Sequence, residues 1–203
     1  MNVLSKKFNS LRTGAILCGG ESSRMGSPKT AIRLVSGLTM IEHVYLALSQ
    51  VCQRVVFVGH AQGIAPALLN RGLHITDEIP GIGPLGALDA LLSSGIDREY
   101  LVTPCDLFRA TPTLYRLLTT EVEGSPVLLR RDGRIEPLIG RYQADLLPMV
   151  RGQLARRELS VRRLVEFCKS GFIDVPDYLA ETLGNANSPQ DLPRYPELTG
   201  GSA

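Results

Sequence analysis

Short apolar runs alternate along this chain with segments whose apolar residues recur every three or four positions. The runs at 15–18, 55–58, 73–76 and 100–103 predict strands, and those at 15–18 and 55–58 are expected to be buried. Between them, the spacing within 39–50 predicts an amphipathic helix, with Thr39 and Glu42 in the pattern of a capping box, and 85–92 predicts an apolar helix. Strands that alternate with helices are typical of a mainly parallel sheet with helices on its faces. We therefore expect an α/β fold.

The second half of the chain follows a less regular pattern. Apolar runs at 127–129 and 137–139 flank Asp132 and Gly133, and Asp-Gly between such runs is typical of a β-hairpin. Helices are expected at 113–120, 144–150 and 160–168, and a last strand at 172–175. We expect one domain over 13–195, a flexible N-terminal extension at 1–12 and a disordered tail at 196–203.

Composition narrows the function classes. A net charge of +2 over 203 residues does not favour a nucleic acid or an anionic membrane as partner. The longest apolar runs are too short to span a bilayer, and the first twelve residues lack the apolar core of a signal peptide, so we expect a cytoplasmic protein. The four cysteines are scattered without zinc or redox spacing, which fits a reducing compartment.

A glycine-rich segment directly after the first predicted strand is the strongest candidate for binding chemistry. It contains Gly19 and Gly20, then Arg24 and Lys29. Glycines let backbone N–H groups approach an anion, and the two side chains add positive charge, so the segment predicts a phosphate-binding loop. Its spacing fits neither the P-loop nor the dinucleotide fingerprint. The alternative is an ordinary Gly/Ser turn.

Two further segments follow predicted strands and belong to the same edge of the sheet. The first is a Gly/Pro-rich loop that begins at Asp77 and includes Gly83, Pro84 and Leu85. Its carboxylate can accept hydrogen bonds from a ribose or a base. The second carries Asp106 just past the strand 100–103. A carboxylate at this place would hold a Mg²⁺ ion that bridges phosphates. The alternative is that Asp106 caps the next loop or helix. In open α/β sheets ligands bind at this edge.

These motifs together resemble a known family. The pattern of Leu17, Cys18, Gly19, Gly20, Ser22, Arg24, Met25, Gly26 and Lys29 is similar to the signature of nucleotidyltransferases with a Rossmann-like, glycosyltransferase-A fold. Taken with Gly83-Pro84-Leu85, with Pro104-Cys105-Asp106 and with Asn185-x-Asn187-Ser188-Pro189-x-Asp191-Leu192, it resembles the molybdenum cofactor guanylyltransferases. The resemblance covers about 13–195 and implies a three-layer α/β/α fold with a mainly parallel, twisted sheet.

The resemblance implies a Mg²⁺-dependent reaction in which the phosphate of molybdopterin attacks the α-phosphorus of GTP and pyrophosphate leaves. It implies GTP and molybdopterin as ligands, with cofactor-assembly proteins and recipient molybdoenzymes as candidate partners. By the same resemblance, Arg24, Lys29 and Asp106 are the expected catalytic residues, and Asp106 and Asn187 would bind metal. The remaining nucleotide or pterin contacts are expected from the backbone of Leu17 to Gly20 and from Asp77, Gly83, Pro84, Leu85, Arg162, Asn185 and Asn187.

The chain also departs from the family pattern. Cys18 replaces a common Ala, Pro28 stands where an Asp often precedes the Lys, and Glu136 precedes Pro137 where a His is expected. Two other functions stay open. One is transfer of CMP to the same pterin, or transfer to another small phosphorylated substrate; the other is a catalytically silent nucleotide-binding module. The presence of both Lys29 and Asp106 argues against a silent module.

Overall fold

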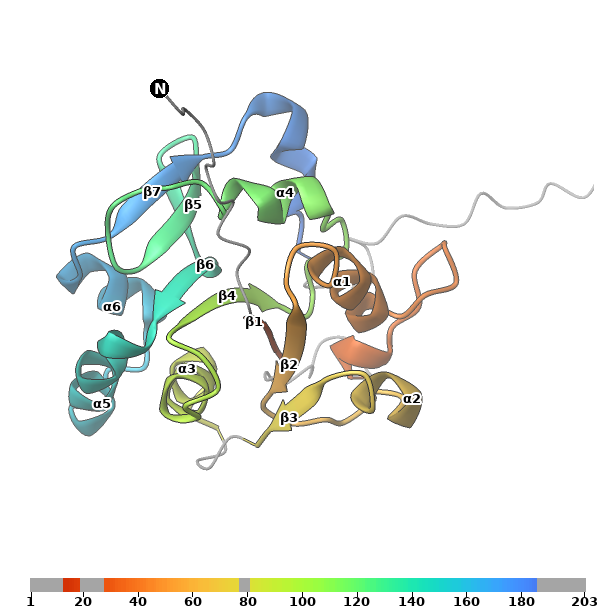
Figure 1. The fold of residues 1–203 in the computed structure, drawn as a ribbon, viewed down its shortest axis with the longest axis horizontal. Coiled ribbons are helices and arrows are strands. Elements are labelled where there is room, and N and C mark those ends of the chain that lie inside the picture. Colours follow the sequence, from red (N-terminus) through yellow and green to blue (C-terminus); the bar gives the residue numbers. More distant parts are fainter. Residues whose placement is uncertain (1–12, 19–27, 77–80, 186–203) are drawn as a thin grey trace, which may run out of the picture.

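The computed structural model describes residues 13–18, 28–76 and 81–185 (Figure 1). In these ranges seven strands form one sheet in the order β3-β2-β1-β4-β6-β5-β7. The strands are β1 (Thr13–Leu17), β2 (Arg54–Val58), β3 (Leu73–Ile75), β4 (Glu99–Pro104), β5 (Val127–Arg131), β6 (Arg134–Gln143) and β7 (Gly171–Asp174). Within the described sheet, β6 is antiparallel to its neighbours β4 and β5, and the other pairings are parallel. The expectation of a mainly parallel sheet is confirmed.

Helices cover both faces of the sheet, which gives the expected three layers (Figure 1). On one face the apolar side chains belong to α1 (Met40–Leu48), α2 (Pro66–Leu69) and α4 (Pro112–Leu117). On the other they belong to α3 (Pro84–Ser93), α5 (Leu147–Ala155) and α6 (Val161–Phe167). Three short 3-10 helices complete the described elements: η1 (Lys29–Ala31), η2 (Ala144–Leu146) and η3 (Asp177–Leu183).

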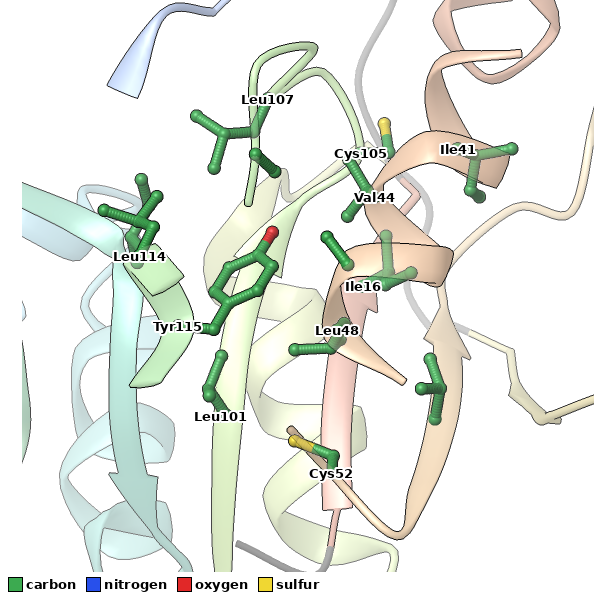
Figure 2. Packing of buried hydrophobic residues seen from close by; sticks show 14 of the residues in the cluster. Ile16, Ile41, Val44, Leu48, Cys52, Leu101, Cys105, Leu107, Leu114 and Tyr115 are labelled. Atoms are coloured by element: carbon green, nitrogen blue, oxygen red, sulfur yellow. The ribbon is translucent and has the colours of Figure 1, made fainter. Parts of the chain in front are cut away.

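The core between β1, β4, α1 and α4 is closely packed. Figure 2 shows Ile16 of β1 next to Val44 and Leu48 of α1, and the ring of Tyr115 on α4 belongs to the same cluster. The Tyr115 hydroxyl lies 2.9 Å from the Thr103 hydroxyl on β4, so these two buried hydroxyl groups satisfy each other. This packing fixes β4, and therefore the residues that follow it, relative to β1.

Local sequence signals account for several element ends. Thr39 caps α1, because its hydroxyl accepts from the backbone N–H of Glu42 and the Glu42 carboxylate accepts from the backbone N–H of Thr39. Asp132 and Gly133 both have positive φ, 48° and 74°, and join β5 to β6 as the predicted hairpin. The helix expected at 144–150 begins as η2 and continues as α5 to Ala155. Along the described ranges, no helix combines the length and the apolar character needed to cross a bilayer.

Candidate active site

The pocket lies where the chain changes direction across the sheet. From β1 the chain adds β2 and then β3 on one side, and it then crosses to β4 on the other side of β1. Leu17 and Pro104 are partners at the carboxyl ends of β1 and β4. A pocket of about 380 Å³ opens at this point, where open α/β sheets bind ligands. It is lined by Leu17, Lys29, Gly83, Pro84, Ala87, Pro104, Cys105, Asp106, Glu136, Pro137, Leu138, Ile139 and Asn185.

An ion pair lies in this pocket. The Nζ of Lys29 is 2.6 Å from Oδ2 of Asp106, and the two side chains are 23% and 15% exposed. Asp106 follows the buried end of β4, and Lys29 begins η1. The hydroxyl of the buried Thr30 donates to the carbonyl of Gln62 and thereby holds η1 in place. Two residues predicted to be catalytic from distant parts of the sequence therefore lie in contact.

The first turn of α3 forms another wall. Gly83 precedes the helix with φ 72° and ψ −156°, a backbone conformation that residues other than glycine rarely adopt. Pro84 occupies the first helical turn, where its missing N–H costs little. The positive end of α3 thus borders the pocket and favours an anionic ligand there. The side chain of Leu85 is fully buried in the core, so a ligand contact by Leu85 is restricted to its backbone.

A bulge in β6 forms the wall on the opposite side. Glu136 pairs with Leu129, but the next pair is Gly140 with Leu128, so residues 137–139 bulge out of the ladder. The pairing of β6 with β4 also ends at Gly140, opposite Val102. The carboxyl end of β4 therefore separates from β6. The intervening residues line the pocket, and the hydroxyl of the buried Tyr142 donates to the carbonyl of Pro137.

Burial raises the pKa of ionisable groups in and beside the pocket. Desolvation raises the pKa of Glu136 above its ordinary value of 4.5, against the opposing influence of the Arg162 charge. Burial also raises the pKa of the Cys105 thiol to about 12 and raises that of Cys18. Both thiols are therefore protonated at neutral pH and are poor nucleophiles.

The structure brings most of the described predicted residues together. Leu17, Lys29, Gly83, Pro84, Asp106 and Asn185 line one pocket. Arg162, on α6, is exposed and does not line the pocket, but its positive charge lowers the pKa of Glu136, which does. The backbone N–H of Cys18 donates to the carbonyl of Val58 at 2.7 Å, so a nucleotide contact by the backbone of Cys18 would have to come from its carbonyl. Gly19, Gly20, Arg24, Asp77 and Asn187 lie outside the described residues.

The sequence analysis named Glu136 only as a departure from the family pattern and did not predict the wall formed by Glu136 to Ile139. A proline inside an apolar strand pattern is a signal for a bulge, and Pro137 carries that signal. Ala87, Pro104 and Cys105 were also not predicted as lining residues.

The donor set suits Mg²⁺. Among the described residues, no three His, Cys, Asp or Glu side chains form a metal cluster. The carboxylate of Asp106 lines the pocket in contact with Lys29. Mg²⁺ commonly binds through one or two carboxylates, with substrate phosphates and water as its other ligands, so one oxygen donor of this kind fits.

Comparisons with known proteins agree with this geometry. Residues 14–171 match the family model of the MobA-like NTP transferase domain. The chain is 31% identical to a probable molybdenum cofactor guanylyltransferase of Carboxydothermus hydrogenoformans, over 88% of this chain and 92% of the relative. It is 33% identical to a probable molybdenum cofactor guanylyltransferase of Mycobacterium marinum, over 89% of this chain and 90% of the relative.

Solved structures share the fold. The molybdopterin-guanine dinucleotide biosynthesis protein A of Archaeoglobus fulgidus superposes with a TM-score of 0.72 at 22% identity, over 88% of this chain and 94% of that one. The inositol-1-phosphate CTP transferase of T. maritima superposes with a TM-score of 0.67 at 10% identity, over 91% and 92%. The fold, the pocket at the switch point and the match over residues 14–171 lead to one conclusion: the chain belongs to the MobA-like NTP transferase family and has a nucleotidyltransferase function.

Proposed function

We propose that this protein transfers GMP from GTP to the phosphate of molybdopterin. A phosphate oxygen of molybdopterin forms a new P–O bond with the α-phosphorus of GTP. The bond from that phosphorus to the bridging oxygen breaks, and its electron pair leaves with pyrophosphate. The product is a guanine dinucleotide form of the pterin. The relatives described as molybdenum cofactor guanylyltransferases support this choice of substrates.

The observation that carries the proposal is the Lys29–Asp106 pair at the switch point. Transfer at phosphorus requires mainly the positioning of two substrates and the neutralisation of phosphate charge. Lys29 supplies a fixed positive charge to the phosphates, and the first turn of α3 adds its positive end. Since the acceptor brings its own nucleophilic oxygen, no nucleophilic side chain is required, and the neutral thiol of Cys105 does not supply one.

Asp106 would hold Mg²⁺, with Asn187 as a further expected ligand. When bound, the metal supplies charge neutralisation between the phosphates. Asp106 holds Lys29 through one carboxylate oxygen, so a cation bound at this carboxylate would weaken the ion pair and make the ammonium group of Lys29 more accessible to the phosphates. Loading of the site would thus shift Lys29 from Asp106 towards the phosphates.

Donor choice is the first test. GTP, CTP and ATP are titrated against the protein with Mg²⁺, and each is then offered with molybdopterin while pyrophosphate and the dinucleotide product are measured. The proposal expects tight binding and product formation with GTP alone. Productive use of CTP would instead make the protein a cytidylyltransferase. Nucleotide binding without any product would favour the silent module.

A further inference from the structure

The pocket contains a second carboxylate that the proposed transfer step does not use. Glu136 lies on β6, is half-buried and lines the pocket opposite the start of α3. None of the hydrogen bonds or ion pairs among the described residues engages its carboxylate, and the charge that acts on it is that of Arg162. Burying a charged group without hydrogen-bond donors is unfavourable, so a ligand that supplies donors would be favoured here.

The place of Glu136 in the sheet indicates which substrate it meets. β1 and β3 lead into the two glycine-rich segments assigned to the nucleotide, and both strands lie on one side of the gap between β1 and β4. Glu136 lies on the other side, on the strand beyond β4. Lys29 and Asp106 stand between the two sides. A donor nucleotide on the β1 side leaves the β6 side to the acceptor.

The walls around Glu136 suit a flat ring with a hydrogen-bonding edge. Pro137 and Leu138 are only partly buried and offer apolar surface, and the carboxylate of Glu136 is the acidic group of this wall. A 2-amino-4-oxopyrimidine ring presents two adjacent N–H donors on one edge, and the two oxygens of a carboxylate can accept both. Guanine and pterin share this edge, so either substrate has the required chemistry. The position on β6 favours the pterin.

We propose that Glu136 is a specificity-determining residue whose carboxylate accepts hydrogen bonds from the amide N–H and amino group of the pterin of the acceptor. This inference rests on the proposed function, because it takes molybdopterin as the acceptor. The positive charge of Arg162 acts on this carboxylate and favours its ionised form, the form that accepts both hydrogen bonds.

The first experiment compares Glu136→Gln with the wild-type protein in steady-state transfer from GTP to molybdopterin. Glutamine keeps the size of the side chain but replaces one acceptor oxygen by an NH₂ donor, which opposes the amino group of the pterin. We expect the KM for molybdopterin to rise about 10- to 100-fold, the range for losing hydrogen bonds to a charged group, while the Kd for GTP is unchanged. Glu166→Gln is the matched control, because it removes an exposed carboxylate from the neighbouring α6 outside the pocket.

The second experiment uses fluorescent ring probes that carry no phosphate. 6-Hydroxymethylpterin has the amino group, and 6-hydroxymethyllumazine has a carbonyl oxygen in its place. With GTP and Mg²⁺ present, the wild-type protein should bind the pterin at least about 10-fold more tightly. Glu136→Gln should reverse this preference, because its NH₂ group can donate to the lumazine oxygen. A loss of packing alone would weaken both probes equally.

The outcomes separate this inference from the proposed function. If the wild-type protein transfers GMP to molybdopterin, the proposed function stands. An unchanged KM for molybdopterin in Glu136→Gln, or the same probe preference in both proteins, would then overturn the role of Glu136. A weakened GTP Kd in Glu136→Gln would assign the carboxylate to guanine and overturn the pterin assignment. Absence of transfer by the wild-type protein would overturn the proposed function itself.

Discussion

The ammonium group of Lys29 and the carboxylate of Asp106 lie 2.6 Å apart, although 77 positions separate the two residues in the sequence. Asp106 lies just after the end of β4, and Lys29 belongs to the segment that follows β1. The contact therefore depends on the parallel pairing of β1 with β4. It also means that a cation bound at this carboxylate would compete with Lys29.

Replacing Lys29 by Met should have opposite effects on two ligands. Without nucleotide, Mg²⁺ should bind about 2- to 5-fold more tightly, because a partly screened ion pair worth up to about 1 kcal/mol no longer competes. GTP should bind more weakly, because its phosphates lose a fixed positive charge. Isothermal titration of each ligand checks both signs. A parallel loss of Mg²⁺ and GTP affinity would contradict the competition.

Replacing Asp106 by Asn should reduce kcat about 10²- to 10³-fold, the usual range when a group that stabilises transition-state charge is removed. GTP affinity measured without Mg²⁺ should be retained or rise, because a negative charge near the phosphates is lost. Asp174→Asn is the matched control, since Asp174 is exposed on β7, pairs with Arg130 and does not line the pocket. Equal kcat values for the two variants would exclude Asp106 from the reaction.

Replacing Glu136 by Gln should stabilise the unliganded protein at neutral pH. Burial raises the folded-state pKa of Glu136, so its ionised form destabilises the fold at a pH above that value. As pH falls towards 4.5, the wild-type carboxyl becomes protonated and the difference should vanish. Thermal unfolding should show a gain in Tm of about 1–3 °C at pH 7.5 and none below pH 4.5. A constant gain at all pH values would exclude ionisation as its cause.

Replacing Thr39 by Ala should lower the free energy of unfolding by about 1 kcal/mol, because the capping box of α1 loses its hydroxyl. The hydrogen bond from the Thr39 backbone N–H lowers the pKa of Glu42, so this part of the stability is present above pH 4.5 and is lost as pH falls below it. Thr39→Ser keeps the hydroxyl and should unfold like the wild-type protein in urea. A Ser variant as unstable as the Ala variant would mean that the methyl group matters instead.

Two glycines should respond to alanine with opposite signs. A Cβ on Gly124, whose φ is 131°, would lie 2.2 Å from the backbone N of Gly171, so Gly124→Ala should cost more than about 3 kcal/mol or prevent folding. A Cβ on Gly152, inside α5, would meet only an arginine side-chain atom at 3.8 Å. Gly152→Ala should therefore raise stability by about 0.5–1 kcal/mol. Urea unfolding of both variants checks the prediction.

The sequence predicts those features that depend on neighbouring residues or on the edge of the sheet at which a strand ends. The capping box at Thr39 and the hairpin at Asp132 depend on neighbouring residues, and the meeting of Lys29 with Asp106 follows from two parallel strands ending at one edge. The wall at Glu136 depends on something less local. β4 stops pairing with β6 at Val102, and that register joins positions far apart in the chain. Pro137 signals a bulge next to residue 136, but it does not specify that register.

The direction of β6 also affects how this site can change during evolution. Because β6 runs against the other strands, its first residues lie at the edge where β1 and β4 end. One wall of the pocket is consequently a single continuous segment, 136–139, next to a hairpin turn, whereas the opposite wall is assembled from distant segments. Exchange or lengthening of that one hairpin would alter one half of the pocket and leave the other half in place. A gene encoding this chain could thus acquire a new acceptor by a change confined to one short stretch of codons.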